Sequence, residues 1–231
     1  MDQHTARLAV STVIFALRSE AGDPPALWTP FVRRTREPHL DQWALPGGWL
    51  PDAEPLEDAA ARTLAETTGL RPSYLEQLYT FGALDRSPTG RVISVVYWAL
   101  VRSDEVTDAA VGNNVQWFPA DDLPALAFDH NAIVDYALQR LRTKVEYARI
   151  AHTFLGETFT LAQLRSVHEA VRGQPLDPAN FRRSITASAD IVETGERLAG
   201  TPHRPPRLYR YRQFTPGSTD PIPTEQTRTL S

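Results

Sequence analysis

Residues 45–70 read LPGGWLPDAEPLEDAAARTLAETTGL and decide how the rest of the chain is interpreted. Proline restricts φ, and paired glycines permit φ > 0 and close approach of backbones, so residues 45–48 predict a tight turn. Residues 55–68 predict a helix, because proline suits a first helical position and Gly69 suits a helix end. Its apolar residues recur every four positions and form one stripe that can pack on a sheet. They are Leu56, Ala60 and Leu64.

The same stretch resembles the Nudix box. That motif begins with a glycine, five residues of any type and a glutamate. Seven further residues of any type separate this glutamate from the sequence Arg-Glu-apolar-any-Glu-Glu-any-Gly-apolar. The matching positions are Gly48, Glu54, Arg62, Leu64, Glu66, Gly69 and Leu70. The alternative interpretation is an ordinary acidic amphipathic helix in an α/β domain.

Two positions depart from the motif and bear on catalysis. Thr63 and Thr67 stand where the family has two of its three helix carboxylates, which hold Mg²⁺ against a pyrophosphate. Hard cations need several anionic oxygens, and a hydroxyl carries no charge. Only Glu66 remains of the three, with Glu54 nearby in the sequence. The resemblance therefore implies a Nudix fold that keeps a ligand pocket but has weak or no hydrolytic activity. We accordingly expect no metal site and no catalytic residue, and we expect that the protein is not an enzyme.

Composition is that of an ordinary globular protein. The chain has 231 residues, of which 42% are hydrophobic and 23% charged, enough for one large or two modest domains. The absence of cysteine excludes disulfides and thiolate metal sites and fits a cytoplasmic location. The apolar run at residues 8–17 is too short to span a bilayer and lacks a basic flank, so it predicts a buried strand and no membrane association.

Charge is divided unevenly along the chain. Residues 1–139 carry a net charge of −9 and residues 140–231 carry +5, within a total of −4. This asymmetry predicts two modules, the second of which has an anionic partner. A solvated basic face is the alternative explanation.

The front module alternates between strands and helices. The predicted strands are residues 7–18, 26–34, 74–82, 91–101 and 115–119, placed around the helix at residues 55–68. This order fits a mixed α/β sandwich.

Two segments of the front module resemble Nudix proteins that handle ADP-ribose. They are residues 81–92 (FGALDRSPTGRV) and residues 123–130 (LPALAFDH), which precede the last helix of the module. Arginine side chains suit pyrophosphate and ribose oxygens, and aromatic rings can stack on adenine. The predicted effector-binding residues are Arg36, Trp49, Glu54, Arg62, Glu66, Phe81, Asp85, Arg86 and Arg91, with Tyr97 a further stacking candidate.

Each of these residues also has a structural interpretation. Arg62 can pair with Glu66 one helical turn later. Arg86 and Arg91 can be ordinary loop charges, and the aromatic rings can belong to the core. Residues 129–130 are expected to cap a helix rather than to form part of a site.

The back module begins with a long helical pattern. Residues 131–151 contain neither Gly nor Pro, so we expect a helix that bridges the two modules and whose apolar stripe is also a dimer surface. A second helix starts at Thr160, which forms a capping box with Gln163. A third helix is predicted over residues 178–188.

The third helix has a distinctive outer face. Phe181 and Ile185 share its buried side, and Arg183 points directly opposite. Arg and Asn are the natural partners of guanine and adenine edges. Two strands, residues 191–198 and 207–212, follow around a basic loop, which completes a winged helix-turn-helix. The predicted DNA-binding residues are Thr160, Asn180, Arg182, Arg183, Thr186, His203, Arg204 and Arg207. A winged helix that makes protein contacts is the alternative.

Taken together, residues 5–213 resemble the Nudix-related transcriptional regulators of NAD metabolism. The resemblance is carried by residues 159–161 (FTL), 176–183 (LDPANFRR), 194–195 (TG) and 203–210 (HRPPRLYR) behind the Nudix-like stretch. It implies a homodimeric bacterial repressor of NAD biosynthesis or salvage genes that binds a near-palindromic double-stranded operator. ADP-ribose or a related nucleotide is the implied effector, and no cofactor is required.

The predicted domains are a Nudix-like nucleotide-sensing domain at residues 1–139 and a winged helix-turn-helix DNA-binding domain at residues 140–214. Residues 215–231, rich in Pro, Thr and Ser, are predicted to be a disordered tail. One alternative function is a pyrophosphatase that hydrolyses ADP-ribose or a dinucleotide and recruits Glu54, Glu57 or Asp58 for Mg²⁺. Another is a nucleotide-sensing protein-interaction module that binds no DNA.

Overall fold

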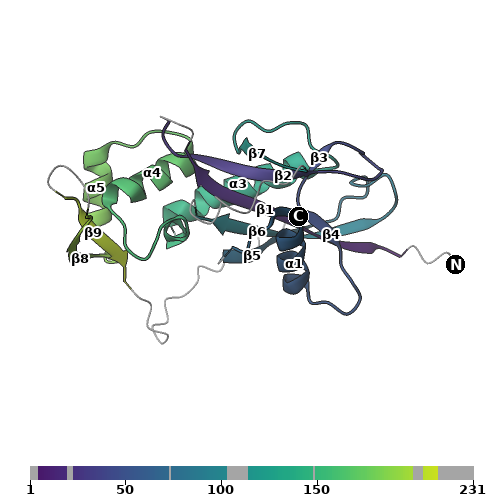
Figure 1. The fold of residues 1–231 in the computed structure, drawn as a ribbon, viewed down its shortest axis with the longest axis horizontal. Coiled ribbons are helices and arrows are strands. Elements are labelled where there is room, and N and C mark those ends of the chain that lie inside the picture. Colours follow the sequence, from purple (N-terminus) through teal and green to yellow (C-terminus); the bar gives the residue numbers. More distant parts are fainter. Residues whose placement is uncertain are drawn as a thin grey trace, which may run out of the picture.

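The computed structural model describes residues 5–19, 23–72, 74–102, 114–147, 149–199 and 205–212. A large sheet lies toward the N-terminal end and a small helical unit with its own two-stranded sheet lies at the opposite end (Figure 1). This is the order of units that the sequence predicts.

The large sheet contains seven strands. They are β1 (Arg7–Arg18), β2 (Ala26–Arg33), β3 (Trp43–Ala44), β4 (Gly47–Trp49), β5 (Tyr74–Phe81), β6 (Val92–Val101) and β7 (Val115–Pro119). The main path runs β3-β2-β1-β6-β5, with β4 paired to β1 and β7 paired to β2. Strands β1 and β6 are parallel over ten residue pairs, from Arg7↔Val92 to Ala16↔Val101, and the other pairs are antiparallel. Because both central strands are covered on both faces, they read as continuous apolar runs.

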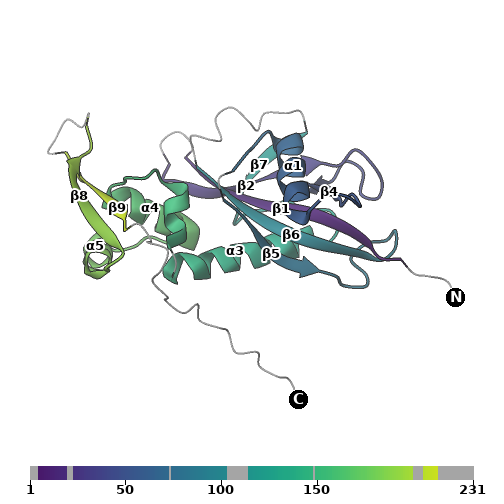
Figure 2. The ribbon, with the colours of Figure 1, turned by 90° about the horizontal axis from the view of Figure 1, so that it is seen from below.

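Helices cover the two faces of this sheet. Helix α1 (Leu56–Thr68) buries Leu64 against Ile14 and Ala99 on one face. Helix α3 (His130–Tyr147) packs its apolar stripe on the other face, where Ile133 and Leu141 are fully buried. The two helices lie on opposite sides of the sheet in Figure 2. This layering is the mixed α/β sandwich predicted from the sequence.

The glycine pair departs from the prediction of a tight turn. Gly47 and Gly48 form strand β4, opposite Ser11 and Val10 of β1, and neither has a positive φ. Gly47 is needed for close approach, since a Cβ there would lie 2.6 Å from the carbonyl oxygen of Val10. The pairing with β1 is a long-range contact that the local turn signal could not reveal.

The ends of α1 also differ in detail from the prediction. Pro55 occupies the N-cap position, with extended backbone, rather than the first helical position. Gly69 ends the helix in the left-handed conformation, at φ 72°, as its position predicted.

The predicted bridging helix is shorter than residues 131–151. Helix α3 ends at Tyr147 and a 3₁₀ segment, η1 (Arg149–Phe154), follows. The tighter winding turns Ile150, Ala151 and Phe154 into the core shared by the sheet and the C-terminal helices, where each is buried.

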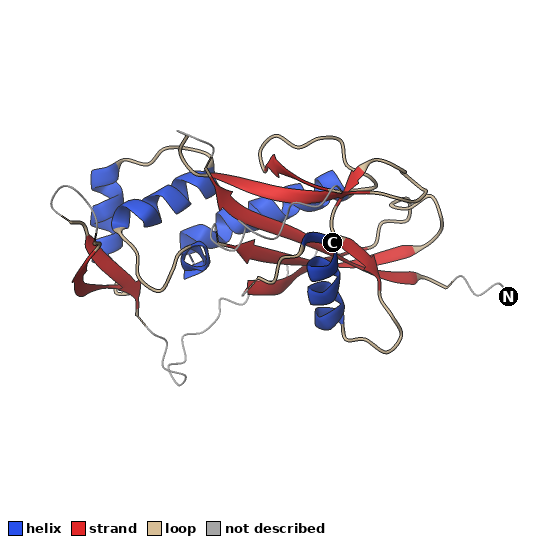
Figure 3. Cartoon of the chain, viewed as in Figure 1, coloured by secondary structure: helices blue, strands red, loops and turns tan. Residues whose placement is uncertain are grey.

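The C-terminal unit is a winged helix. It contains α4 (Leu161–Arg172), α5 (Pro178–Ala187), β8 (Ile191–Arg197) and β9 (Arg207–Tyr211). Thr160 and Gln163 form the predicted capping box of α4. Figure 3 shows the two-stranded wing separate from the main sheet. The predicted tail at residues 215–231 and wing residues His203 and Arg204 lie outside the described residues.

One hydrophobic core runs through both units. It includes Phe15 and Trp98 of the sheet, Leu141 of α3, Leu164 of α4 and Tyr209 of β9. Within the described residues, no helix combines the length and apolar character needed to cross a membrane.

Candidate functional site

A cavity of about 700 Å³ lies where the N-terminal part of β1, the end of β2, strand β4 and the start of α3 meet. Its charged lining residues are Arg7, Arg33, Arg34, Arg36, Glu37, Glu66 and Arg86. Five arginines against two glutamates make this an electropositive site. Such a site suits an anionic ligand, because guanidinium groups form forked hydrogen bonds with phosphate oxygens.

The loop after β2 forms one wall of the cavity and is held in a defined shape. Arg34 donates from Nε to the Pro38 carbonyl at 2.8 Å and from Nη2 to the Arg36 carbonyl at 3.3 Å. Its guanidinium lies 4.7 Å from the centroid of the Phe128 ring, which His39 contacts edge-on. His39 and Phe128 both have positive φ, at 65° and 58°. Such backbone strain persists only where surrounding contacts over-determine it, so this wall is preformed.

Arg86 lies at the cavity with one edge of its guanidinium, formed by Nε and Nη2, bound to a carboxylate. Its Nε and Nη2 donate to the two carboxylate oxygens of Asp129, each at 2.9 Å, and its side chain is 6% exposed. Residues 129–130 were expected to cap a helix rather than to form part of a site. The Asp129 backbone carbonyl accepts from the Ile133 N–H at the start of α3, whereas its carboxylate binds the cation of a distant loop and His130 lines the cavity.

His130 is the buried histidine of the cavity lining. Its Nδ1 accepts a hydrogen bond from the Leu45 backbone N–H at 3.0 Å, so the neutral ring carries its proton on Nε2. Burial lowers the pKa of His130 to about 4, and the ring is therefore neutral at pH 7.

The cavity floor is polar. The hydroxyls of Ser11 and Ser94, which are 7% and 1% exposed, lie 3.2 Å apart. One hydroxyl proton suffices for the bond between them, so the pair retains a second O–H for a ligand acceptor. Gly47 is adjacent, because its missing Cβ would lie 2.9 Å from Ser11 Oγ.

An exposed aromatic ring lines the same cavity. Trp49 is 47% exposed, and the Arg7 guanidinium lies 3.6 Å from its ring centroid. This is a cation–π contact. Arg7 therefore covers one face of the Trp49 ring, which the sequence analysis predicted to stack on adenine.

Two carboxylates of the Nudix-like motif, Glu54 before α1 and Glu66 on it, are held by one arginine. Arg62 donates to Glu54 at 2.8 and 2.6 Å and to Glu66 at 3.1 Å. The hydrogen bond from Arg62 lowers the pKa of Glu54, so both partners are charged and offset one another. Among the residues that the structure describes, no group of three or more His, Asp or Glu side chains could hold a metal ion.

The two threonines of the motif bond to their own helix. Thr63 Oγ1 donates to the Ala59 carbonyl and Thr67 Oγ1 donates to the Thr63 carbonyl, each at 2.6 Å. Such back-bonding occupies the hydroxyl proton within the helix. A hydroxyl in this arrangement offers a metal neither charge nor a second oxygen.

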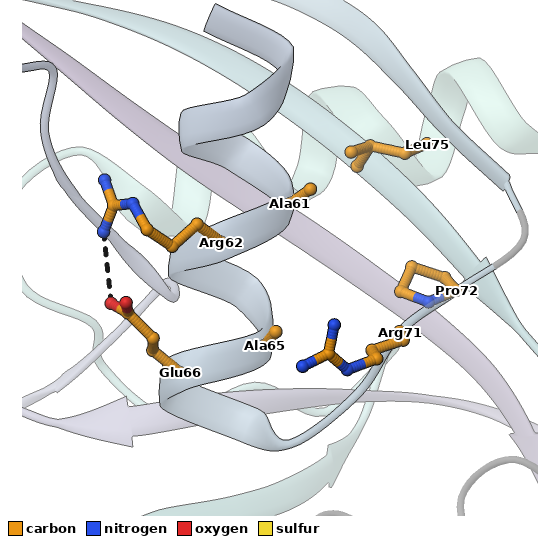
Figure 4. Close-up of a pocket in the computed structure, with 7 residues that line it drawn as sticks. All are labelled: Ala61, Arg62, Ala65, Glu66, Arg71, Pro72 and Leu75. Carbon is orange, nitrogen blue, oxygen red and sulfur yellow. Dashed lines mark hydrogen bonds and ion pairs between the residues drawn. The ribbon is translucent and has the colours of Figure 1, made fainter. Parts of the chain in front are cut away.

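A smaller hollow of about 460 Å³ lies on the outer side of α1. It is lined by Ala61, Arg62, Ala65, Glu66, Arg71, Pro72 and Leu75 (Figure 4). The ion pair between Arg62 and Glu66 closes one side of it. It contains two arginines, of which Arg62 is paired with Glu66, whereas five arginines line the larger cavity.

The structure brings only some of the predicted effector residues together. Arg36, Trp49, Glu66 and Arg86 line the cavity, whereas Glu54, Arg62, Phe81, Asp85 and Arg91 do not. Phe81 packs against Tyr79 and Tyr136, and Arg91 donates to the carbonyls of Gly82 and Ala83. Tyr97 is buried in the core under α1.

Sequence reasoning missed several residues of the cavity. They are Arg7, Ser11, Arg33, Arg34, Ser94, Phe128 and His130. Arg33 and Arg34 could have been found from their closeness to Arg36 in the sequence. The serine pair depends on the parallel pairing of β1 with β6, which a local sequence pattern does not predict.

The second candidate site is the outer face of α5. Asn180, Arg182, Arg183 and Thr186 are exposed there, whereas Phe181 and Ile185 are half-buried and pack against the core. Thr160 is 4% exposed and its hydroxyl serves as the cap of α4. Arg207 on the wing pairs with Glu193, at 2.8 Å and 3.0 Å.

Comparison with known proteins finds both units. Residues 7–141 match the NUDIX domain family and residues 151–211 match the NrtR DNA-binding winged helix domain. The ADPR responsive transcriptional repressor NtrR of Acinetobacter baylyi is 30% identical over 210 residues, which cover 88% of this chain and 81% of that protein.

Solved structures extend this similarity over both units. The crystal structure of Shewanella oneidensis NrtR has a TM-score of 0.75 and 34% identity, covering 89% of this chain and 94% of that chain. The same protein in complex with a 27mer DNA has a TM-score of 0.72 and 32% identity, covering 89% of this chain and 93% of that one. The predicted fold class is thereby confirmed. An ADP-ribose pyrophosphatase of Methanocaldococcus jannaschii is 36% identical over 106 residues, which cover 46% of this chain and 63% of that enzyme.

Proposed function

The chain belongs to the NrtR family, in which a Nudix domain precedes a DNA-binding winged helix, and from this premise we propose that it is an ADP-ribose-responsive repressor of transcription. The winged helix binds double-stranded operator DNA, and the cavity binds ADP-ribose or a related nucleotide. The regulated genes are those of NAD biosynthesis or salvage, as the resemblance of the sequence implies. The protein acts as a cytoplasmic homodimer on a near-palindromic operator.

The observation that carries this proposal is an arginine-rich cavity in the same chain, and on the same hydrophobic core, as a winged helix. Arg33, Arg34 and Arg36 on one wall and Arg86 on another are placed for the charges of a pyrophosphate. The paired serine hydroxyls and the Nε2–H of His130 suit the neutral oxygens and nitrogens of ribose and adenine.

The cavity is built to hold such a ligand rather than to cleave it. Cleavage in the Nudix manner needs a cation gripped by several carboxylates. Here Glu54 and Glu66 both pair with Arg62, which offsets one of their two negative charges, and the hydroxyls of Thr63 and Thr67 bond to helix carbonyls. Arginines supply the positive charge for the ligand, so the protein requires no metal for binding.

On the DNA side, α5 is the recognition helix. Its outer face offers Arg183 and Asn180 to base edges in the major groove. In a symmetric dimer, two such helices enter successive major grooves roughly 34 Å apart, so the operator is a near-palindrome. Arg207 at the wing edge is placed for a phosphate contact.

The second candidate function is a pyrophosphatase, which the similarity to the Methanocaldococcus enzyme favours. It requires Mg²⁺ to recruit Glu57 or Asp58, which are exposed in the first turn of α1, together with Glu54. That similarity spans only the Nudix unit and leaves the winged helix without a role.

The two functions are separated by one pair of assays on the full chain. Calorimetric titration with ADP-ribose in the presence of EDTA is expected to show binding, and incubation with ADP-ribose and Mg²⁺ is expected to release AMP only at the background rate. Magnesium-dependent turnover, or binding that vanishes in EDTA, would favour the enzyme.

A matched pair of variants tests the location of the ligand. Arg36→Ala removes a charged cavity residue and is expected to weaken ADP-ribose binding by about 10- to 100-fold, the usual effect of losing a hydrogen bond to a charged group. Arg71→Ala removes an arginine that lines only the outer hollow of α1, and is expected to leave binding unchanged. Equal losses in the two variants would place the ligand elsewhere.

A further inference from the structure

Helix α3 is the element that both candidate sites share. It begins at His130, which lines the cavity, and ends at Tyr147 beside the winged helix. Its 18 residues span about 27 Å at the helical rise per residue. Figure 2 shows it running along one side of the sheet to the C-terminal unit.

The cavity end of α3 is tied to a cavity arginine. Asp129 directly precedes the helix, and its backbone carbonyl accepts from the Ile133 N–H at 3.1 Å. Its carboxylate holds Arg86 through two bonds of 2.9 Å, and Arg86 is almost fully buried. A pyrophosphate that takes its hydrogen bonds from Nε or Nη2 of Arg86 competes with this carboxylate for those donors.

The other end of α3 is tied to the winged helix by a second arginine. Arg142 donates from Nε to the Val171 carbonyl in the last turn of α4 at 2.9 Å. The same side chain donates from Nη2 to Asp121, two residues after β7, at 2.6 Å. One guanidinium thus joins α3, the sheet domain and the winged helix. A Cβ at Gly173, the C-cap of α4, would lie 3.5 Å from both Arg142 and Asp121, so the three segments are in close contact.

Between its two ends α3 is a packed, continuous helix. Ile133, Val134, Ala137 and Leu141 are completely buried against the sheet. Close-packed interiors transmit small displacements instead of absorbing them. A displacement of α3 at its Asp129 end would therefore also shift Arg142 near its far end.

We propose that α3 transmits the effector signal, with Arg86–Asp129 as the contact that the nucleotide opens and Arg142 as the positioning residue that passes the shift to the winged helix. The inference rests on the proposed function and adds the residues that couple its two sites. Neither Arg142 nor Asp121 lines the cavity, and neither lies on the DNA-binding face of α5.

The test measures coupling rather than affinity. The dissociation constant for ADP-ribose is determined on the full chain with and without saturating operator DNA obtained by selection, and the ratio is the coupling factor. A ratio of about 5 to 150 is expected for the unmodified chain, the range typical of allosteric proteins. Arg142→Gln is expected to bring the ratio close to one, and Asp121→Asn to lower it in part, because the bond from Arg142 to Val171 remains in that variant. In both variants ADP-ribose affinity without DNA and operator affinity without ADP-ribose are expected to stay near their original values.

The control is Arg140→Gln. Arg140 is an exposed arginine two residues earlier on α3, so its loss changes the charge of the helix equally without touching α4. It is expected to retain the original coupling factor. Asp121→Asn covers the case in which Arg142→Gln misfolds, because the Asp121 side chain is 55% exposed and the bond from Arg142 to Val171 remains.

The input contact is tested separately by Asp129→Asn. Releasing Arg86 from its carboxylate is expected to tighten ADP-ribose binding by at least about threefold and to lower the coupling factor, because a charge-assisted hydrogen bond no longer competes with the ligand. A purely structural role for Asp129 would weaken binding instead.

The failures can be told apart. Full coupling in both Arg142→Gln and Asp121→Asn would overturn the role of Arg142, and weaker binding in Asp129→Asn would overturn the input contact. A coupling factor of one in the unmodified chain would overturn the proposed function itself.

Discussion

At Gly47 the absence of a side chain lets β4 lie against β1, and thereby sets the wall of the cavity. A Cβ there would meet the Val10 carbonyl at 2.6 Å and Ser11 Oγ at 2.9 Å. Backbone cannot move aside cheaply, so the whole strand would have to shift. Packing at this single residue thus determines how closely β4 lies beside Ser11 at the cavity.

Gly47→Ala is therefore expected to lower the free energy of unfolding by about 1–3 kcal/mol, the usual effect of overpacking a core. Urea denaturation of the full chain measures this. Gly156→Ala is the control, because the nearest atom to its Cβ would be 3.9 Å away and its φ is not positive. If both variants unfold at the same urea concentration, the close approach at Gly47 does not constrain the fold.

His130 makes a second residue-scale prediction, about pH. Its pKa is about 4 in the folded chain, below the ordinary value of 6.5. In the unfolded chain His130 therefore becomes protonated below about pH 6.5, whereas in the folded chain it becomes protonated only near pH 4. The stability that neutral His130 provides is complete above pH 6.5 and is lost as the pH falls toward 4, by up to about 1.4 kcal/mol per pH unit.

The variant His130→Asn keeps an acceptor for the Leu45 N–H but does not titrate. The free energy of unfolding of the original chain minus that of the variant is expected to shrink as the pH is lowered from 7.5 to 4.5. Denaturation curves at several pH values measure this difference. A difference that is constant over the range would show that His130 is protonated equally in both states.

At the scale of single elements, α5 links its sequence pattern most directly to function. Phe181 and Ile185 pack inward, and Asp177 caps the helix by accepting from the Asn180 N–H at 2.7 Å. This leaves Arg183 on the exposed side, as its angle on the helical wheel predicts.

Arg183→Ala is expected to weaken binding to the selected operator by about 1–3 kcal/mol and to change binding to random DNA much less. Anisotropy titrations on both DNAs, repeated over a series of salt concentrations, measure this. An equal loss on both DNAs, with a shallower salt dependence, would instead make Arg183 a phosphate contact.

Elements with strong local signals could be predicted from the sequence, and those fixed by distant contacts could not. Helices α1 and α5 begin and end within a residue or two of the predictions, and α4 begins within one residue, because proline, glycine and capping residues mark them. The Gly47–Trp49 strand was missed because only its pairing with β1 defines it. Helix α3 is shorter than predicted because the following segment, η1, packs Ile150, Ala151 and Phe154 into the shared core.

The same distinction explains the candidate site. Arg36, Trp49, Glu66 and Arg86 were predicted from side-chain chemistry together with the Nudix-like resemblance, and all four line the cavity. Arg91 was misplaced because its guanidinium folds back onto the carbonyls of its own loop. The residues that the sequence analysis missed line the cavity because of strand pairing and because the loop after β2 packs against Phe128. Both are tertiary contacts, which a local sequence pattern does not reveal.

At the scale of the whole molecule, the two units are not independent. Leu138 and Leu141 lie on either side of the predicted boundary at residue 139, yet both are buried in one core with α4 and β9. The domain boundary at residue 139 remains a prediction, and the hydrophobic core continues across it. A nucleotide bound at one end can therefore influence DNA binding at the other without a hinge or a flexible linker.

The central claim is that the chain senses ADP-ribose without consuming it. The most direct measurement mixes the full chain with labelled operator and Mg²⁺, adds ADP-ribose, follows DNA release by anisotropy and quantifies the nucleotide by chromatography at the end. The account predicts release of the operator with the ADP-ribose recovered intact. Release that tracks the appearance of AMP, or DNA that stays bound at saturating ADP-ribose, would contradict it.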